Sequence, residues 1–168
     1  MSQTPFSPFE NDLDRDAALT VLREATAGAD DGELFFERRR SEALMFDDGR
    51  LKTASYDASE GFGLRAVRGE VAGYAHSTEI SEQALQRAAK TARLAVGEGG
   101  GTWADAPEGT NKKLYTDADP IEGAAFPVKV ETLREMDAFM RDLDTRVVQV
   151  SASIAASLRC AISLASRQ

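Results

Sequence analysis

The sequence predicts an α+β fold, in which an antiparallel meander β-sheet is covered by about three α-helices and ends in a C-terminal β-hairpin. Three observations predict it. Three segments carry apolar residues at the three- and four-residue spacing of amphipathic helices. Between the first and second of them, short turn signals separate five segments of strand length and β-rich composition. After the third, two more segments alternate like strands.

The first helical segment covers residues 12–27 and stops before Gly28. The second begins after Ser81, which fits an N-cap, and ends at a run of glycines from Gly97. The third covers 128–145. The second helix carries a narrow stripe of mostly small side chains, which allows close approach to a sheet: Ala84, Leu85, Ala88, Ala89, Ala92 and Ala95.

The strand-like segments lie between turn signals such as Asp47-Asp48-Gly49 and Gly69-Glu70. Short turns of this kind join neighbouring antiparallel strands, so consecutive strands are expected to pair as a meander with one face that needs a cover. The predicted C-terminal hairpin has a turn at 155–158, and its last strand leaves an unpaired edge. The predicted strands are 33–40, 42–47, 51–57, 61–68 and 71–78 in the meander, and 147–154 and 160–165 in the hairpin.

One domain is expected over residues 12–168, because a chain of this length buries about 70% of its unfolded surface. Residues 1–11 hold two prolines and no apolar period, which indicates a flexible lead-in. Residues 98–127 hold three of the five prolines and the only tryptophan, Trp103, and are expected to form a long connection over the surface.

Charge and composition exclude several classes of function. The net charge is −8 and the pI about 4.8, which disfavours nucleic acid as a partner. No apolar run approaches the roughly 20 residues that cross a bilayer, and the N-terminus does not resemble a secretory signal. The single cysteine, Cys160, suits a reducing compartment, so a cytoplasmic location and no membrane contact are expected.

Catalytic groups are scarce. A catalytic zinc ion needs three protein ligands, and the chain holds one histidine and one cysteine, so we expect neither a metal site nor another cofactor in it. Gly61–Ala66 fits a loose GxGxxA pattern, but strand-like residues follow it where a dinucleotide site needs a helix. We interpret these glycines as positions of close backbone approach or bulging.

Three polar-tipped residues on predicted strands are candidates for contacts with a substrate or at an interface: Arg65, Tyr74 and His76. The alternative interpretation gives each a purely structural role, as is usual for a partly exposed strand residue.

Several segments, in order along the chain, resemble the beginning of TldD proteins, and the most specific is GFGLRAVRGEVAGYA at 61–75. The others are GELFFE at 32–37, FDDGRLK at 46–52, LYTDADP at 114–120 and DTRVVQVSAS at 144–153. On these segments the chain is similar to the amino-terminal, non-catalytic region of the TldD/PmbA family, which are bacterial zinc metallopeptidases also named modulators of DNA gyrase.

The resemblance implies a larger enzyme, in which a carboxy-terminal domain carries an HExxxH motif and a later cysteine as zinc ligands. None of these ligands is in this sequence, so zinc is expected only in that other domain. It also implies a TldD-type catalytic half and a PmbA/TldE-like paralogue as partners. The assembly would degrade unfolded or small peptides and mature modified peptides in an enclosed cavity.

Three functions follow as hypotheses. The chain is an accessory domain that helps to form the peptide chamber and the subunit interface, a stand-alone module that binds peptides by strand addition, or an inactive truncated fragment. A truncated gene, a frameshift or a deliberately shortened chain would each account for an ending before the family's second half.

Overall fold

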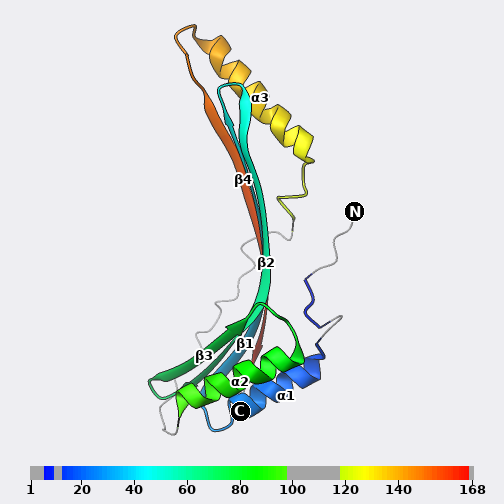
Figure 1. Cartoon of the computed structure of the whole chain (residues 1–168), viewed down its shortest axis with the longest axis vertical. Helices are drawn as coiled ribbons and strands as arrows, with labels where there is room; N and C mark the ends of the chain where they lie inside the picture. Colours follow the sequence, from blue (N-terminus) through cyan, green and yellow to red (C-terminus); the bar gives the residue numbers. More distant parts are fainter. Residues whose placement is uncertain (1–5, 10–12, 98–117, 167–168) are drawn as a thin grey trace. The chain divides into compact units, whose positions relative to one another are not determined.

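The computed structural model describes residues 6–9, 13–97 and 118–166. The four strands form one sheet in the order β3-β2-β1-β4 (Figure 1). The elements are α1 (Arg15–Ala25), β1 (Asp31–Asp47), β2 (Arg50–Arg68), β3 (Val71–Ser77), α2 (Glu82–Val96), α3 (Phe126–Leu143) and β4 (Ser151–Ala165). The predicted α+β class, the antiparallel meander and its three helices are confirmed.

The meander has fewer and longer strands than the sequence indicated. The predicted strands 33–40 and 42–47 form the single strand β1, and 51–57 and 61–68 form β2. The residues that separate these segments hold no proline, and each strand has a neighbour along its length to pair with. The turn predicted at Asp47-Asp48-Gly49 is present, with positive φ at Asp48 and Gly49, as a type I′ hairpin turn requires.

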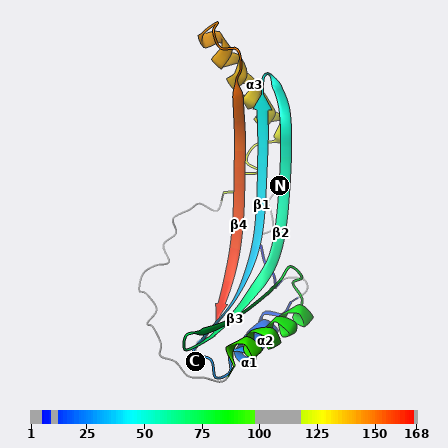
Figure 2. The same ribbon diagram turned by 60° about the vertical axis from the view of Figure 1, so that its left-hand side comes forward.

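The prediction of a C-terminal hairpin is wrong. Residues 151–165 form one continuous strand, β4 (Figure 2). The exposure of its side chains alternates without a break through the expected turn at 155–158. Those residues, Ala155-Ala156-Ser157-Leu158, contain none of the glycine, proline or asparagine that reverses a chain. Backbone hydrogen bonds from Asp48 to Val150 and from Ser166 to Gly32 show that β4 runs antiparallel beside β1.

Contacts divide the chain into two compact units. The first unit contains the described residues through Arg38, those from Ser59 to Gly97, and those from Cys160 onward; the second contains those from Arg39 to Ala58 and from Ala118 to Arg159. Strands β1, β2 and β4 contribute to both units, so the single domain predicted over 12–168 stays a prediction. Most of the predicted lead-in and residues 98–117 of the predicted connection, with Trp103, lie outside the described residues.

The core of the first unit lies between the sheet and the adjacent helices α1 and α2 (Figure 1). Each helix has a side-chain cap: Asp14 accepts the backbone N–H of Ala17, and Ser81 accepts that of Ala84. Gly73 lets α2 approach β3 closely, because a Cβ at this position would lie 2.1 Å from the carbonyl oxygen of Ala92. The largest fully buried side chains of this core are Leu22, Leu34, Phe36, Leu64 and Leu85.

In the second unit, α3 packs against the sheet through the fully buried Leu133, which joins Leu44 and Phe46 of β1. Two polar contacts flank this small core. The buried ammonium of Lys129 donates to the carboxylate of Glu42 and to the carbonyl oxygen of Ile121. Near the other end of the helix, Asp137 accepts the backbone N–H of Gly49 and an N–H of Arg141, and Arg141 also binds Asp48.

Replacing Leu85 by alanine is expected to lower the free energy of unfolding by about 2–5 kcal/mol, because it opens a cavity under α2. The matched change Leu94→Ala, on the same helix, removes a side chain that is 73% exposed and is expected to cost about 0.5 kcal/mol or less. Urea denaturation followed by circular dichroism measures both. Similar losses in the two variants would contradict the packing described here.

Replacing Lys129 by methionine is expected to lower the free energy of unfolding by about 3–5 kcal/mol, because it leaves the carboxylate of Glu42 partly buried and unpaired. Arg134→Met, which removes an exposed ion pair on the same helix, is expected to cost at most about 1 kcal/mol. In the double variant Lys129→Met, Glu42→Leu, part of the loss should return. Additive losses in urea denaturation would show that the two side chains are not coupled.

Candidate functional site

The three candidate residues Arg65, Tyr74 and His76 lie on one face of the sheet in the first unit. On β2, Leu64 is buried under the helices, so strand alternation directs its neighbour Arg65 to the opposite face. On β3, Gly73 approaches α2, so Tyr74 and His76 also point away from the helices. Arg65 is the register partner of Tyr74. The structure therefore brings together residues that the sequence indicated separately.

Aromatic rings form a row across this face. The ring centroids of Phe35 and Tyr74 are 6.5 Å apart with an interplanar angle of 17°, and those of Tyr74 and His76 are 5.8 Å apart at 29°. Stacked rings of this kind stabilise each other by about 0.5–1.5 kcal/mol beyond the area they bury. We call Phe35, Tyr74, His76 and Arg65 the sheet-face site.

Gly63 makes room for the row. It is the register partner of His76, and a Cβ there would lie 2.4 Å from Cε1 of Phe35 and 2.6 Å from the hydroxyl oxygen of Tyr74. A Cβ at Gly61 would lie 2.4 Å from the carbonyl oxygen of Ser77. Both glycines lie inside β2, where no helix N-terminus follows, so their interpretation as positions of close approach is confirmed.

Sequence reasoning missed Phe35. In the segment Leu34-Phe35-Phe36 three apolar residues follow one another, so the pattern does not show which of them leaves the core. The structure buries Leu34 and Phe36 completely and leaves Phe35 half-buried on the other face. The aromatic residues two positions apart at Tyr74 and His76 were the available signal for an aromatic row on one face.

The sheet-face site is suited to binding. Half-exposed rings bind apolar and amide groups by stacking, and the exposed guanidinium of Arg65 can donate to carbonyl or carboxylate oxygens. At the β1–β4 side of the same face, the hydroxyl of Ser163 donates to the carboxylate of Glu33 at 2.6 Å. Among the four residues of the sheet-face site, no side chain forms a nucleophile–base pair with another.

The described residues do not fit a zinc site. Among them, no group of three or more His, Cys, Asp or Glu side chains is arranged to hold a metal ion. His76 stacks on Tyr74, and Cys160 packs against the core of the first unit. We therefore derive no chemical step through a metal from this part of the chain. In the same residues, no helix is long and apolar enough to cross a membrane.

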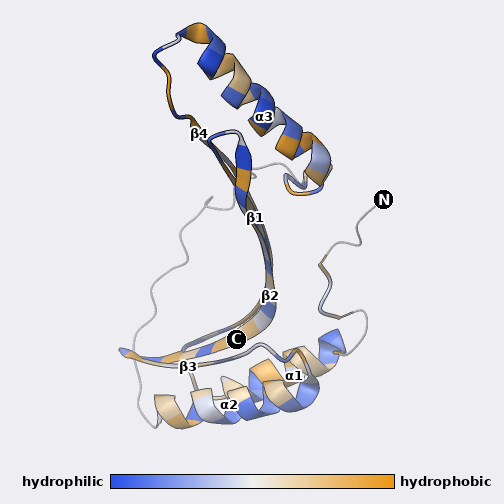
Figure 3. Ribbon diagram, turned by 45° about the horizontal axis from the view of Figure 1, so that its top comes forward, coloured by the Kyte–Doolittle hydropathy of each residue, from blue (hydrophilic) through white to orange (hydrophobic). Residues whose placement is uncertain are grey.

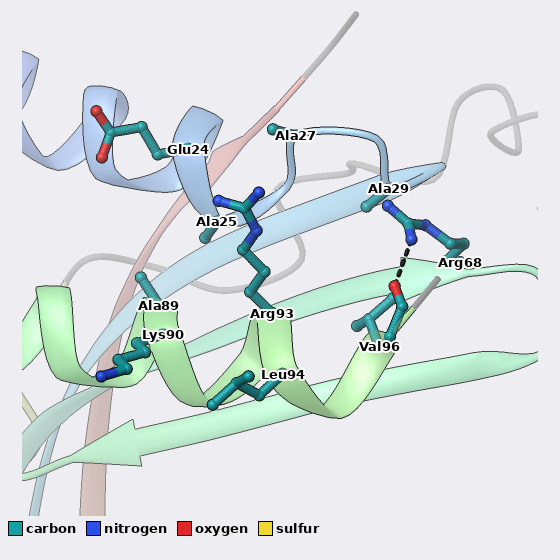
Figure 4. A pocket seen from close by; sticks show the side chains of 11 residues that line it. Glu24, Ala25, Ala27, Ala29, Arg68, Ala89, Lys90, Arg93, Leu94 and Val96 are labelled. Atoms are coloured by element: carbon teal, nitrogen blue, oxygen red, sulfur yellow. Dashed lines mark hydrogen bonds between the residues drawn. The ribbon is translucent and has the colours of Figure 1, made fainter. Parts of the chain in front are cut away.

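A pocket of about 500 Å³ lies in the first unit near the C-terminal ends of α1 and α2 (Figure 4). Arg68 occupies one wall, where its guanidinium donates to the carbonyl oxygens of Gly28, at 2.6 Å, and of Gly97. These hydrogen bonds satisfy carbonyl groups just beyond the C-terminal ends of the two helices, so Arg68 has a structural role. Lys90 and Arg93 lie along the pocket with Glu24, so we interpret it as a helix junction rather than a ligand site.

In the second unit, a carboxylate has a structural role within 114–120, one of the segments that resemble TldD proteins. Asp119 accepts from Arg40 at 2.6 Å and from the backbone N–H groups of Ile121 and Glu122. Burial alone would raise the pKa of Asp119, but the two N–H groups and Arg40 outweigh it and hold the pKa below its ordinary value of 3.8. Asp119 therefore stays ionised near neutral pH and cannot serve as a general acid.

Comparison with known proteins gives one family. Residues 32–96 match the family model described as PmbA/TldA metallopeptidase domain 1. A "Metalloprotease TldD homolog" of Buchnera aphidicola is 30% identical over 145 residues, which are 86% of this chain and 30% of that protein. A protein of the same description from Haemophilus influenzae is 31% identical over 128 residues, which are 74% of this chain and 27% of that protein.

Solved structures share the fold. TldE from Thermococcus kodakarensis superposes with a TM-score of 0.62 at 17% identity, over 88% of this chain and 34% of that one. A protein of Bacteroides thetaiotaomicron described as a proposed modulator of DNA gyrase gives a TM-score of 0.63 at 14% identity, over 90% of this chain and 36% of that one. At these identities the likeness supports the fold alone.

The family match includes the strands and the helix that build the sheet-face site, since residues 32–96 contain β2, β3, α2 and nearly all of β1. The chain spans about 30% of the length of the curated TldD relatives it matches. It belongs to the TldD/PmbA family and corresponds to the family's amino-terminal domain.

Proposed function

We propose that this chain acts as a non-catalytic domain of a TldD-like zinc metallopeptidase, where it helps to form the peptide chamber and the subunit interface. The observation that carries the proposal is the sheet-face site, an uncovered row of rings beside a cation in a domain whose described residues hold no metal-ligand set. Such a surface binds without cutting.

The chemistry of the sheet-face site suits unfolded or small peptides. An extended peptide exposes apolar side chains and amide planes, which stack on half-exposed rings regardless of sequence. Its carbonyl groups and terminal carboxylate accept hydrogen bonds from a guanidinium such as that of Arg65. A peptidase that degrades or matures varied peptides needs such tolerant contacts around its cleavage site.

The proposed partners follow from the family. Because the curated TldD relatives are about three times as long as this chain, we propose that a TldD-type catalytic half supplies the zinc and its ligands. A PmbA/TldE-like paralogue would complete the assembly in the cytoplasm. Zinc in that catalytic half would polarise the peptide carbonyl and activate water, while this chain positions the peptide.

Strand addition is a second candidate function, favoured by one observation. β3 and β4 are the outermost strands of the sheet, and within the described residues no further strand pairs with the outer edge of either. An extended peptide could pair its backbone with such an edge. In that case backbone N–H groups, and not the side chains of the sheet-face site, would determine affinity.

Mixing this chain with a separately produced catalytic half of a TldD-type protein is expected to raise peptide cleavage above that of either part alone. Replacing both Arg65 and Tyr74 by alanine should lower this cleavage by about tenfold or more, because two exposed contacts to the peptide are lost. Cleavage of a fluorogenic peptide is the measurement. Cleavage should also stop when a chelator removes zinc from the catalytic half.

Two exposed residues off the site provide matched controls. Arg87→Ala removes a guanidinium on α2, and Val71→Ala removes an exposed side chain at the start of β3. Neither should change cleavage, and urea denaturation should show that all variants are folded. Binding of peptides without any partner, unaffected by the Arg65 and Tyr74 changes, would favour strand addition. If the mixture is inert and no peptide binds, the proposal is refuted.

A further inference from the structure

Helix α3 carries apolar side chains that the sheet of the second unit does not cover. Leu133 is fully buried against β1, whereas apolar side chains on one flank of the same helix face solvent. The apolar and charged segments that alternate along α3 are visible in Figure 3. The exposed side chains of this flank are Val128 (56%), Met136 (46%), Phe139 (63%), Met140 (44%) and Leu143 (62%).

Polar contacts fix the rotation of α3 about its axis. Lys129, bound to Glu42 near one end, and Asp137, bound to the N–H of Gly49 near the other, are both buried on the side that faces the strands. A rotation that buried Phe139 would expose these groups and separate them from their partners, which costs several kcal/mol for a buried charge. The exposed flank therefore cannot turn inward.

The exposed flank has the spacing of a helix-pairing seam. Thr132, Met136, Phe139 and Leu143 are all exposed and follow one another at intervals of four, three and four residues, as the a and d positions of a coiled coil do. In that register, the g positions on one side of the seam are Glu135 and Asp142, and the e positions on the other side are Leu133 and Met140. Neither carboxylate forms an ion pair within the described part of the chain.

From this arrangement we propose that the exposed flank of α3 is a docking surface for one helix of a partner protein, with an apolar seam bordered by Lys or Arg. Flanking charges of opposite sign determine which helices pair, so Glu135 and Asp142 select a basic-edged partner. The inference deepens the proposed function and rests on it for the source of the partner, because a domain that joins a peptidase assembly needs a docking surface. α3 has 18 residues, or about 27 Å, long enough for five turns of a partner helix.

A second copy of this chain fits the surface poorly. In an antiparallel pair of α3 helices, the acidic positions beside the seam would face each other, and each chain carries a net charge of −8. The exposed apolar side chains offer on the order of 500 Å². That area suits one docked helix, and it falls short of the about 800 Å² per partner of a standard dimer interface.

The test uses two synthetic 21-residue helical probes with leucine at every a and d position. One carries lysine at the e and g positions and the other glutamate, and their binding to the full chain is measured by fluorescence anisotropy at low salt. The lysine probe is expected to bind about tenfold or more tightly than the glutamate probe. Replacing Phe139 and Leu143 by alanine should weaken its binding by at least about tenfold without changing the unfolding midpoint.

Charge reversal makes the test specific. In the variant Glu135→Lys, Asp142→Lys the preference between the two probes should reverse, whereas Glu70→Lys, on the turn between β2 and β3, should leave it unchanged. Equal affinity of the two probes, or lysine-probe binding that survives the Phe139 and Leu143 changes, would overturn the inference.

Two further outcomes would overturn the inference, because each assigns the surface to a different occupant. Probe binding that appears only after residues 98–117 are replaced by a Gly-Ser linker would assign the surface to that segment. A dimer in sedimentation equilibrium that dissociates on Phe139→Ala would assign it to a second copy. Failure of the probes while the mixed halves still cleave peptide would sink this inference alone; probe binding without restored cleavage would sink the proposed function alone.

Discussion

The close approach of α2 to β3 at Gly73 determines what the first unit presents to solvent. With a hydrogen atom for a side chain, Gly73 lets the carbonyl oxygen of Ala92 pack where a Cβ would otherwise sit. Once this side of β3 is filled by the helix, strand alternation leaves Tyr74 and His76 no direction but the opposite face. The sheet-face site is therefore a consequence of the same packing that forms the core.

In the second unit, polar contacts determine which side of α3 faces solvent. Leu133 alone would hold α3 against β1 without fixing its rotation, because apolar contacts are not directional. The buried Lys129–Glu42 pair and the bond between Asp137 and Gly49 add direction, and they leave the flank with Phe139 exposed. In both units, the contacts that stabilise the core also keep a second face exposed to solvent.

These two faces would divide the tasks that we propose for this domain. The sheet-face site has stacking surfaces and a guanidinium, which suit varied peptides, while the flank of α3 has a regular spacing and one acidic border, which suit one chosen helix. Tolerance and selectivity need different surface chemistry, since stacking accepts many sequences and flanking charges reject most of them. Membership of the TldD/PmbA family is consistent with both surfaces, because the relatives are long enough to include further domains that could contact them.

The sequence by itself determined the three helices, the meander, the hairpin turn at Asp48-Gly49 and the scarcity of metal ligands, because periodicity, turn chemistry and residue counts are local properties. It also pointed to Arg65, Tyr74 and His76. Tertiary structure decided that residues 151–165 form one strand, since pairing with β1 keeps the backbone extended through residues 155–158. Tertiary structure alone also brought Phe35 to the ring row and left Met136, Phe139 and Leu143 of α3 exposed, because which apolar side chains are covered depends on what the rest of the chain packs against them.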